Sequence, residues 1–251
     1  MAVARMAYSQ GDYHAALRNL ESARMRIEEL QSAPIPIRMQ EGETHRLIRL
    51  FGKTYLGLGL YKAAKDYFQQ AIELANVDAS VLQKERISDM RHLAECLRLN
   101  GEGNQAEEVY SKCVEELKTS KVADESSLAK AYLGLGQVCL DRKELDKADH
   151  FLALALGTFE RIKGGKSFWY ARTLMTIARM HYLAGRTEQS EQVLEEALNL
   201  LEPLVGPYHP LRARALNGLA ALLKLEGKDL AADETFAHMQ VIEHYLRQHD
   251  V

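Results

Sequence analysis

The chain has 251 residues, of which 47% are hydrophobic and 27% are charged, and its formal net charge is −3. This composition is that of an ordinary folded protein, and no apolar run reaches the roughly 18 to 20 residues that a membrane span needs. The slight acidity argues against wholesale nucleic-acid binding. Cys96, Cys113 and Cys139 form neither a CxxC pattern nor an even-numbered disulfide framework, so a reducing, cytoplasmic compartment is expected.

A turn residue followed five positions later by a small residue recurs six times along the chain. The small residues are Ala16, Ala64, Ala106, Ala148, Ser190 and Ala232. The turn residues are Gly11, Gly59, Gly101, Lys143, Gly185 and Gly227, and the last five of them lie 42 residues apart. A fixed period with two markers in phase predicts a repeat architecture.

The residues on both sides of each turn follow a helical period. Before the last turn, for example, apolar or small residues stand at i, i+3, i+4 and i+7: Leu216, Leu219, Ala220 and Leu223. This spacing predicts one buried helix face. After the last five turns, a bulky residue follows the small one by four positions: Phe68, Tyr110, Leu152, Leu194 and Phe236. Each copy is therefore predicted to be a helical hairpin that buries its apolar face only by stacking on its neighbours.

The copies are predicted to form a single solenoid over residues 1–251. In chain order they occupy residues 1–33 (a partial copy), 45–80, 87–120, 129–163, 171–205 and 213–249. The first interval between turns is longer than the others and contains Pro34 and Pro36, which predict a local loop insertion.

These residues resemble the tetratricopeptide repeat (TPR) over nearly the whole chain, through the Leu/Ile-Ala/Gly pair of the first helix and the Gly-x-x-x-x-Ala turn. The 42-residue period and the stretch GPYHPLRARALNGLA at 206–220 are similar to kinesin light chains and nephrocystin-like proteins, whose repeats carry G-x-x-H-P-x-x-A-x-x-L-N-N-L-A. Gly218 replaces the second Asn of that pattern, and the other copies have no Asn. The resemblance implies an all-α, right-handed superhelical solenoid of about six hairpins. It also implies a role as a cargo adaptor.

In that same stretch, Gly206 and Pro207 are predicted to end one helix. Pro210 is predicted to begin the next, where its missing N–H costs little.

Basic residues concentrate on the first helices, which line the concave side of such a solenoid. Positions 2, 5, 9 and 12 of the five complete copies hold ten basic residues and one acidic residue, Glu95, which is about four times the basic content of the chain as a whole. The predicted ligand-binding residues are Arg46, Arg49, Lys53, Arg91, Arg98, Lys130, Arg172, Met175, Arg179, Tyr182, Arg214, Asn217 and Lys224.

An electropositive groove of this kind suits an extended acidic peptide, because arginine recognises carboxylates with paired hydrogen bonds. Leu56, Leu133, Met175 and Tyr182 are expected to form apolar pockets between the charges. The predicted function is a non-enzymatic protein-interaction scaffold or adaptor, without cofactor, metal or membrane insertion. A further contact is expected through an exposed face of the last hairpin: Phe236, Met239, Ile242 and Tyr245.

Three other interpretations stay open. The basic residues could be solvated helix faces that pair with acidic neighbours. The chain could be the regulatory or sensor part of a longer protein whose groove holds an intramolecular acidic segment. The ligand could also be a phosphorylated or RNA anion, although few aromatic residues accompany the charges.

Patterns that would indicate catalysis are weak. The stretch IKGGKSF at 162–168 lacks the first glycine of a phosphate-binding loop and no strand precedes it, so it is predicted to be a turn between repeats. Trp169 is predicted either to pack between hairpins or to anchor a ligand at the groove edge.

Overall fold

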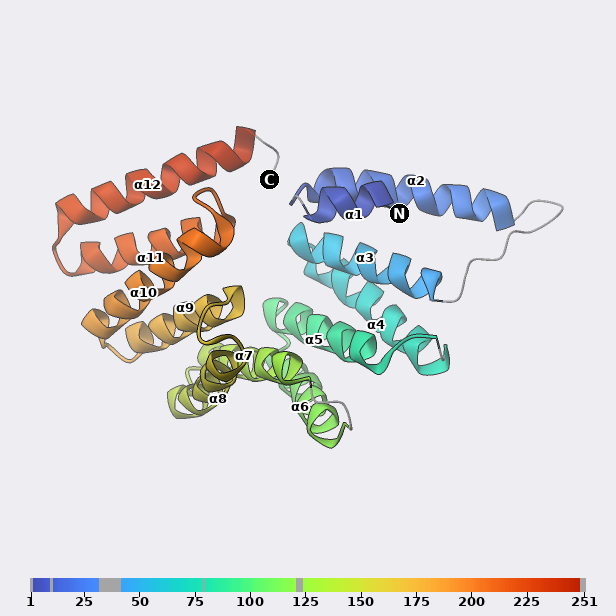
Figure 1. Cartoon of the computed structure of the whole chain (residues 1–251), viewed down its shortest axis with the longest axis horizontal. Helices are drawn as coiled ribbons and strands as arrows, with labels where there is room; N and C mark the ends of the chain where they lie inside the picture. Colours follow the sequence, from blue (N-terminus) through green and yellow to red (C-terminus); the bar gives the residue numbers. More distant parts are fainter. Residues whose placement is uncertain (1, 10, 32–41, 79, 121–123, 249–251) are drawn as a thin grey trace. The chain divides into compact units, whose positions relative to one another are not determined.

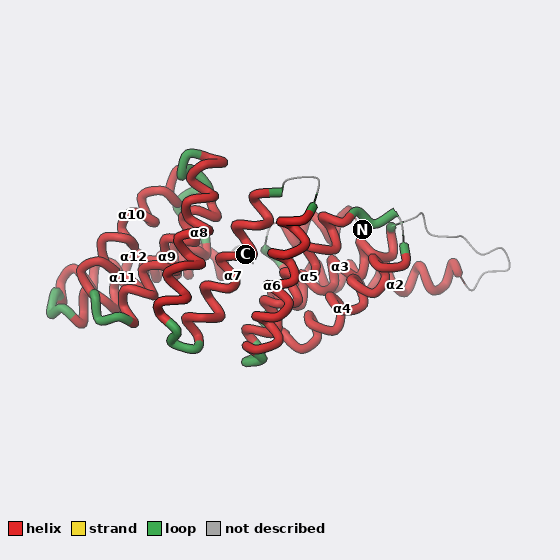
Figure 2. Tube along the Cα trace, turned by 90° about the horizontal axis from the view of Figure 1, so that it is seen from below, coloured by secondary structure: helices red, strands yellow, loops and turns green. Residues whose placement is uncertain are grey.

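The computed structural model describes residues 2–9, 11–31, 42–78, 80–120 and 124–248. Within these ranges the chain forms twelve α-helices and no strand (Figures 1 and 2). The helices are α1 (Ala2–Ser9), α2 (Tyr13–Gln31), α3 (Glu43–Gly57), α4 (Tyr61–Val77), α5 (Gln83–Leu99), α6 (Gly103–Thr119), α7 (Glu125–Asp141), α8 (Leu145–Lys163), α9 (Phe168–Leu183), α10 (Thr187–Val205), α11 (Pro210–Leu225) and α12 (Asp229–Gln248). The all-α prediction is confirmed.

The chain divides into two compact units, Met1–Cys113 and Val114–Asp250, with the division inside α6. We call them unit 1 and unit 2. Consecutive helices pair as antiparallel hairpins, one for each predicted repeat (Figure 1). The single uninterrupted solenoid over 1–251 stays a prediction, and the predicted insertion at Pro34 and Pro36 lies outside the described residues.

Each hairpin closes at a residue in the left-handed region of φ. Glycine fills this place in five of the six described turns, with φ between 73° and 84°. In the turn at Gly101, the Gly101 N–H donates to the Arg98 carbonyl at 3.1 Å and the Glu102 N–H donates to the Leu97 carbonyl at 2.8 Å. These bonds satisfy carbonyls that the end of α5 would otherwise leave without partners. Lys143, with φ of 61°, is the one non-glycine residue with positive φ in the described chain.

Small residues allow the two helices of a hairpin to come close together. A Cβ added to Gly136 would lie 2.7 Å from Leu152 Cδ2, and one added to Gly52 would lie 3.1 Å from the Phe68 ring. Phe68 and Leu152 are fully buried. The bulky residues predicted on the second helices, Phe68 and Leu152, thus pack against glycines of the first helices.

The junction at residues 206–210 also has the predicted form. Helix α10 ends at Val205, Gly206 follows with φ of 79°, and α11 begins at Pro210. His209 caps α11, because its Nδ1 accepts a hydrogen bond from the Leu211 N–H at 3.1 Å. The stretch at 162–168 is a turn as predicted, in which the Ser167 hydroxyl caps α9 by accepting from the Tyr170 N–H at 3.1 Å.

We expect Lys143→Gly to stabilise unit 2. A residue with a Cβ is strained in the left-handed region, and glycine removes that strain at some entropic cost, so the net gain is about 0.5–1 kcal/mol. Thermal unfolding measures the gain as a higher Tm. Gly185→Lys is the reverse change at the next turn, where φ is 73°, and it should lower the Tm. Equal Tm values for all three proteins would contradict the role of the turn residue.

Candidate functional site

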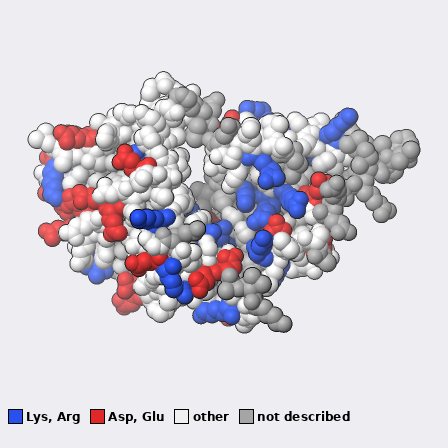
Figure 3. Space-filling model, in the orientation of Figure 1, with Lys and Arg blue, Asp and Glu red and all other residues white. Residues whose placement is uncertain are grey.

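All thirteen predicted ligand-binding residues lie on the first helices of the hairpins. Each unit carries its own candidate surface. Unit 1 holds Arg46, Arg49, Lys53, Arg91 and Arg98, which we call the α3–α5 cluster. Unit 2 holds Lys130 on α7, Arg172, Met175, Arg179 and Tyr182 on α9, and Arg214, Asn217 and Lys224 on α11. Figure 3 shows Lys and Arg atoms gathered over α3 and α5.

A buried carboxylate joins α3 to α5 within unit 1. Asp89 has no solvent exposure; its Oδ2 lies 2.8 Å from His45 Nε2 and its Oδ1 lies 2.8 Å from Arg49 Nε. Arg49 Nη1 also approaches Glu85 Oε1 at 3.5 Å. A buried charge requires such partners, so Arg49 helps to hold two hairpins together. Sequence analysis did not single out Asp89. The available signal was a carboxylate on the first helix of one repeat, next to arginines on the first helix of the neighbouring repeat.

Arg98 is also engaged inside unit 1. Its Nε and Nη2 each lie 3.0 Å from a carboxylate oxygen of Glu95, one helical turn away. The Tyr110 hydroxyl donates to Glu95 Oε2 at 3.2 Å, and burial raises the pKa of Tyr110 well above its usual value. The single acidic residue of the predicted groove positions therefore compensates one of the arginines.

Lys53 differs from these arginines because the described residues give its ammonium no hydrogen-bonded carboxylate. The pKa of Lys53 is lowered to about 8, mainly by burial; the nearby Arg49 and Arg91 also lower it, and Asp89 opposes them. His92, half-buried on α5, stacks on Phe68 at 5.1 Å between ring centroids. The His92 Nδ1–H donates to the Ser88 carbonyl at 2.6 Å, which leaves Nε2 as an acceptor facing Arg91 Nη2 at 3.5 Å. Burial holds the pKa of His92 well below 6.5.

In unit 2, two predicted basic residues lie on the ring of Trp169. Lys130 Nζ is 4.9 Å from the ring centroid and Arg172 Cζ is 5.2 Å from it. Such cation–π contacts contribute about 0.5–1 kcal/mol each at partly exposed sites. The half-buried Trp169 thus connects α7 to α9 on the side that carries the basic residues.

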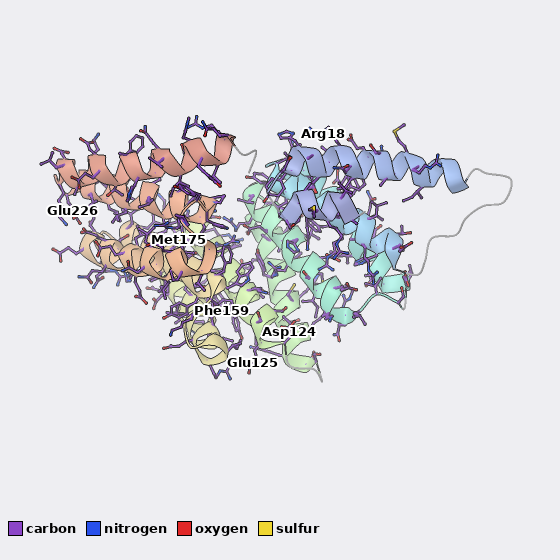
Figure 4. The ribbon with its side chains drawn as sticks, turned by 45° about the horizontal axis from the view of Figure 1, so that its top comes forward. Arg18, Asp124, Glu125, Phe159, Met175 and Glu226 are labelled. Carbon is purple, nitrogen blue, oxygen red and sulfur yellow. The ribbon has the colours of Figure 1, made fainter. Side chains whose placement is uncertain are left out.

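Four predicted residues of unit 2 line a pocket between α9 and α11, which we call the α9–α11 pocket. Its volume is about 280 Å³. Met175 (labelled in Figure 4), Arg179 and Tyr182 contribute from α9, and Arg214 from α11. Leu194 and Ser190 of α10 and several small or apolar residues of α11 complete the lining: Gly218, Ala221, Leu222 and Leu225. The pocket combines an apolar lining with two arginine side chains.

Gly218 is essential to the shape of this pocket. A Cβ added there would lie 3.4 Å from Leu194 Cδ1, so a longer side chain would project into the space that the pocket occupies. The sequence departs from the L-N-N-L-A pattern at this residue.

The two arginines of the pocket, Arg179 and Arg214, are both exposed. Arg179 Nη2 pairs with Asp141 Oδ1 at 2.9 Å near the surface, where such pairs contribute little stability.

Other predicted contributors are not part of this pocket. Asn217 and Lys224 lie exposed on α11 but do not line it, and Arg46 is exposed on α3. Leu133, which was expected to form an apolar pocket, is 2% exposed and belongs to the core instead.

The predicted exposed face of the last hairpin needs a correction. Met239 and Ile242 are each only 5% exposed, because they pack against Ala213 and Leu216 of α11. Phe236 is 43% exposed. Tyr245 stacks on Tyr208 with 4.1 Å between ring centroids. Of the four residues predicted to form an exposed face, only Phe236 and Tyr245 lie at the surface.

The three cysteines are buried thiols, and burial raises the pKa of Cys96 to about 12, which disfavours the reactive thiolate.

Among the described residues, no group of histidines, cysteines and carboxylates could hold a metal ion. None of the described helices combines the length and the apolar character needed to cross a membrane. The cytoplasmic location stays a prediction.

Sequence models of the tetratricopeptide repeat match residues 127–202, 169–238 and 50–78. The chain belongs to the tetratricopeptide repeat family. Repeats of this family typically form non-catalytic scaffolds for protein interactions. A search of curated proteins finds no match to this TPR chain.

Several solved structures share the fold. A putative kinesin light chain from Podosopora anserina is 15% identical, with a TM-score of 0.59 over 84% of this chain and 100% of that chain. BtubC (BKLC) from P. vanneervenii is 18% identical, with a TM-score of 0.65 over 94% and 91%. The Rap conjugation gene regulator of plasmid pLS20, solved in complex with the Phr* peptide, is 14% identical, with a TM-score of 0.72 over 92% and 63%. At such identities these structures show the fold alone, so membership of the kinesin light chain group stays a prediction.

The lowered pKa of Lys53 predicts a specific dependence of stability on pH. Below pH 8 both the folded and the unfolded chain hold this proton, and the buried cation destabilises the fold. Between about pH 8 and the unfolded value near 10.5 only the unfolded chain keeps the proton, so the stability due to this group increases with pH. We expect Lys53→Met to be more stable than the wild-type chain at pH 7, and this advantage to shrink by about 1–2 kcal/mol at pH 10.

Urea unfolding of both proteins at the two pH values measures this difference. Lys62→Met, an exposed change on α4 of the same unit, is the control and should show no such dependence. An advantage of Lys53→Met that stays constant from pH 7 to pH 10 would contradict the assignment.

Proposed function

We propose that this protein is a non-enzymatic interaction scaffold whose first helices bind an extended acidic segment of a partner protein. The observation that carries the proposal is the α9–α11 pocket, which combines an apolar lining with the exposed Arg179 and Arg214. In this arrangement an apolar side chain of the segment enters the pocket, and acidic residues before and after it meet the two arginines.

The size and lining of the pocket support an apolar anchor residue. A volume of about 280 Å³ accommodates one large side chain, and burying a Leu or Phe side chain contributes about 1.5–3 kcal/mol. Met175 adds an adaptable wall, since methionine adjusts to irregular shapes. Tyr182, which is 48% exposed, offers an aromatic surface at the pocket.

The charges of unit 2 support an acidic segment around the anchor. Arg172 and Lys130 are held on Trp169, so their side chains are partly ordered before a ligand arrives, which lowers the entropic cost of binding. Guanidinium groups bind carboxylates with paired hydrogen bonds. Extended peptides in grooves of this kind obtain specificity from pockets for alternate side chains.

A regulatory role is the second candidate. It is favoured by the similarity to the pLS20 regulator, which was solved with a bound peptide and of which this chain covers 63%. In that case the ligand would be a signalling peptide, or a segment of a longer version of this protein, and it would bind at the same surface.

Binding can be followed through Trp169, the one tryptophan of the chain. The probe is a tryptophan-free peptide with a central Phe between Glu residues, beside the same peptide with Ala in place of Phe. We expect a Kd in the micromolar range, about −8 kcal/mol, for the Phe peptide, with weaker binding at higher salt. The Ala peptide should bind at least about tenfold more weakly, since it leaves the pocket empty.

Gly218→Met tests the pocket directly, because the new side chain fills it. The matched control is Gly157→Met on α8, where an added Cβ meets no neighbouring atom, so both variants make the same change in helix propensity. We expect Gly218→Met to lose at least tenfold in affinity for the Phe peptide and little for the Ala peptide. Equal binding by the two variants would reject the α9–α11 pocket as the anchor site, and an Arg179→Gln/Arg214→Gln variant that binds as well as wild type would reject the acidic segment.

A further inference from the structure

Arg179, which lines the α9–α11 pocket, already holds a carboxylate of the chain itself. Its Nη2 donates to Asp141 Oδ1 at 2.9 Å. Arg179 lies one helical turn after Met175 on α9, whereas Asp141 is the last residue of α7. The ion pair therefore links a wall of the pocket to the neighbouring hairpin of unit 2.

This ion pair uses only part of the guanidinium of Arg179. An arginine has five N–H donors, and among the described residues Asp141 is the one hydrogen-bonded acceptor of this side chain. Arg98 differs, because its Nε and Nη2 each bind an oxygen of Glu95 at 3.0 Å. Arg179 is 47% exposed and Asp141 is 34% exposed, so water screens their attraction and the pair contributes little stability.

We propose that Asp141 is an internal competitor for Arg179. In the free protein its carboxylate occupies the place of an acidic side chain of the partner segment, and it thereby lowers the affinity of the α9–α11 pocket for that segment. The inference rests on the proposed function, because it assigns an acidic residue of the partner to Arg179. When the segment binds, its carboxylate replaces that of Asp141.

The geometry of the ion pair favours this exchange. A carboxylate of the segment can accept two parallel hydrogen bonds from the guanidinium, whereas Asp141 accepts one. Once released, the partly exposed carboxylate of Asp141 is solvated by water, so no buried charge is left without a partner. Arg49 could not make such an exchange, because its partner Asp89 has no solvent exposure.

Competition of this kind affects the acidic residues of a ligand and not its apolar anchor. The anchor enters a space lined by side chains such as Met175 and Leu222, and it leaves the Arg179–Asp141 pair intact. A ligand with the same anchor and neutral flanking residues is therefore expected to be insensitive to the charge of Asp141.

A double-mutant cycle with the full chain tests the proposal, with Trp169 fluorescence as the signal of binding. The proteins are the wild type, Asp141→Asn, Arg179→Gln and the double variant. The ligands are two tryptophan-free peptides with blocked termini, one with Phe between Glu residues (the Glu peptide) and one with Phe between Gln residues (the Gln peptide). The ionic strength is about 0.15 M, so that distant charges are screened.

We expect Asp141→Asn to bind the Glu peptide about three- to fivefold more tightly than the wild type does, since exposed ion pairs contribute about this much. The same change should have no effect when Arg179 is already Gln, and the Gln peptide should bind equally to the wild type and to Asp141→Asn. The Tm of Asp141→Asn should match that of the wild type, so a changed affinity cannot come from partial unfolding.

The matched control is Asp233→Asn, which removes the same charge from an exposed position of α12 that does not line the pocket. It should bind the Glu peptide as the wild type does. No gain from Asp141→Asn, or an equal gain with and without Arg179, would overturn the proposal.

Failure of the proposed function gives a different result. In that case the wild type does not bind the Glu peptide, or Gly218→Met binds it equally well, and the competition by Asp141 is rejected together with the pocket. If the wild type binds the Glu peptide, Gly218→Met binds it more weakly and the cycle shows no coupling between Asp141 and Arg179, only the competition is rejected.

Discussion

The close approach of the two helices of a hairpin, seen in α3–α4 and α7–α8, is the contact on which the other features of this protein depend. It is most constrained at Gly136, where a single added carbon would lie 2.7 Å from Leu152 Cδ2, and Gly52 faces Phe68 in the same way. Since interiors are packed without spare volume, such a contact fixes the rotation of the first helix against the second. One face of the first helix is thereby buried. The adjacent face carries the basic side chains, which are not part of this contact.

Charged residues on these adjacent faces serve two different purposes. Asp89 is wholly buried and lies 2.8 Å from both His45 Nε2 and Arg49 Nε, so some basic residues of unit 1 hold its own hairpins together. Arg179 differs from Arg49, because it pairs with the carboxylate of Asp141 at the surface. The proposed peptide surface uses a cation of this second kind, because a surface ion pair contributes little stability and a carboxylate of a ligand can replace it.

The repeat itself could be predicted from the sequence, because helical hairpins of one length leave a strict period. The turns at Gly59 and Gly101, the start of α11 at Pro210 and the burial of bulky residues such as Phe68 and Leu152 all follow from local spacing. The pairing of the basic residues could not be predicted in the same way. Whether Arg49 meets Asp89 depends on which faces of neighbouring hairpins touch, and the burial of Leu133 and Met239 depends on it as well. The α9–α11 pocket was only partly foreseen: Met175 and Tyr182 were expected there, but the role of Gly218 depends on its distance from Leu194.

Binding of partners to the first helices can be tested by carbon-13 labelling of the methionine methyl groups. Met175 lines the α9–α11 pocket on α9, Met25 is 60% exposed on α2, and Met239 is buried on α12, so the three methyl groups report on different surfaces. When the full chain is titrated with the Phe-containing acidic peptide, we expect the Met175 signal to shift in proportion to binding while those of Met25 and Met239 stay in place. A shift at Met25 or Met239 with an unchanged Met175 signal would mean that the ligand binds to the second helices and not to the α9–α11 pocket.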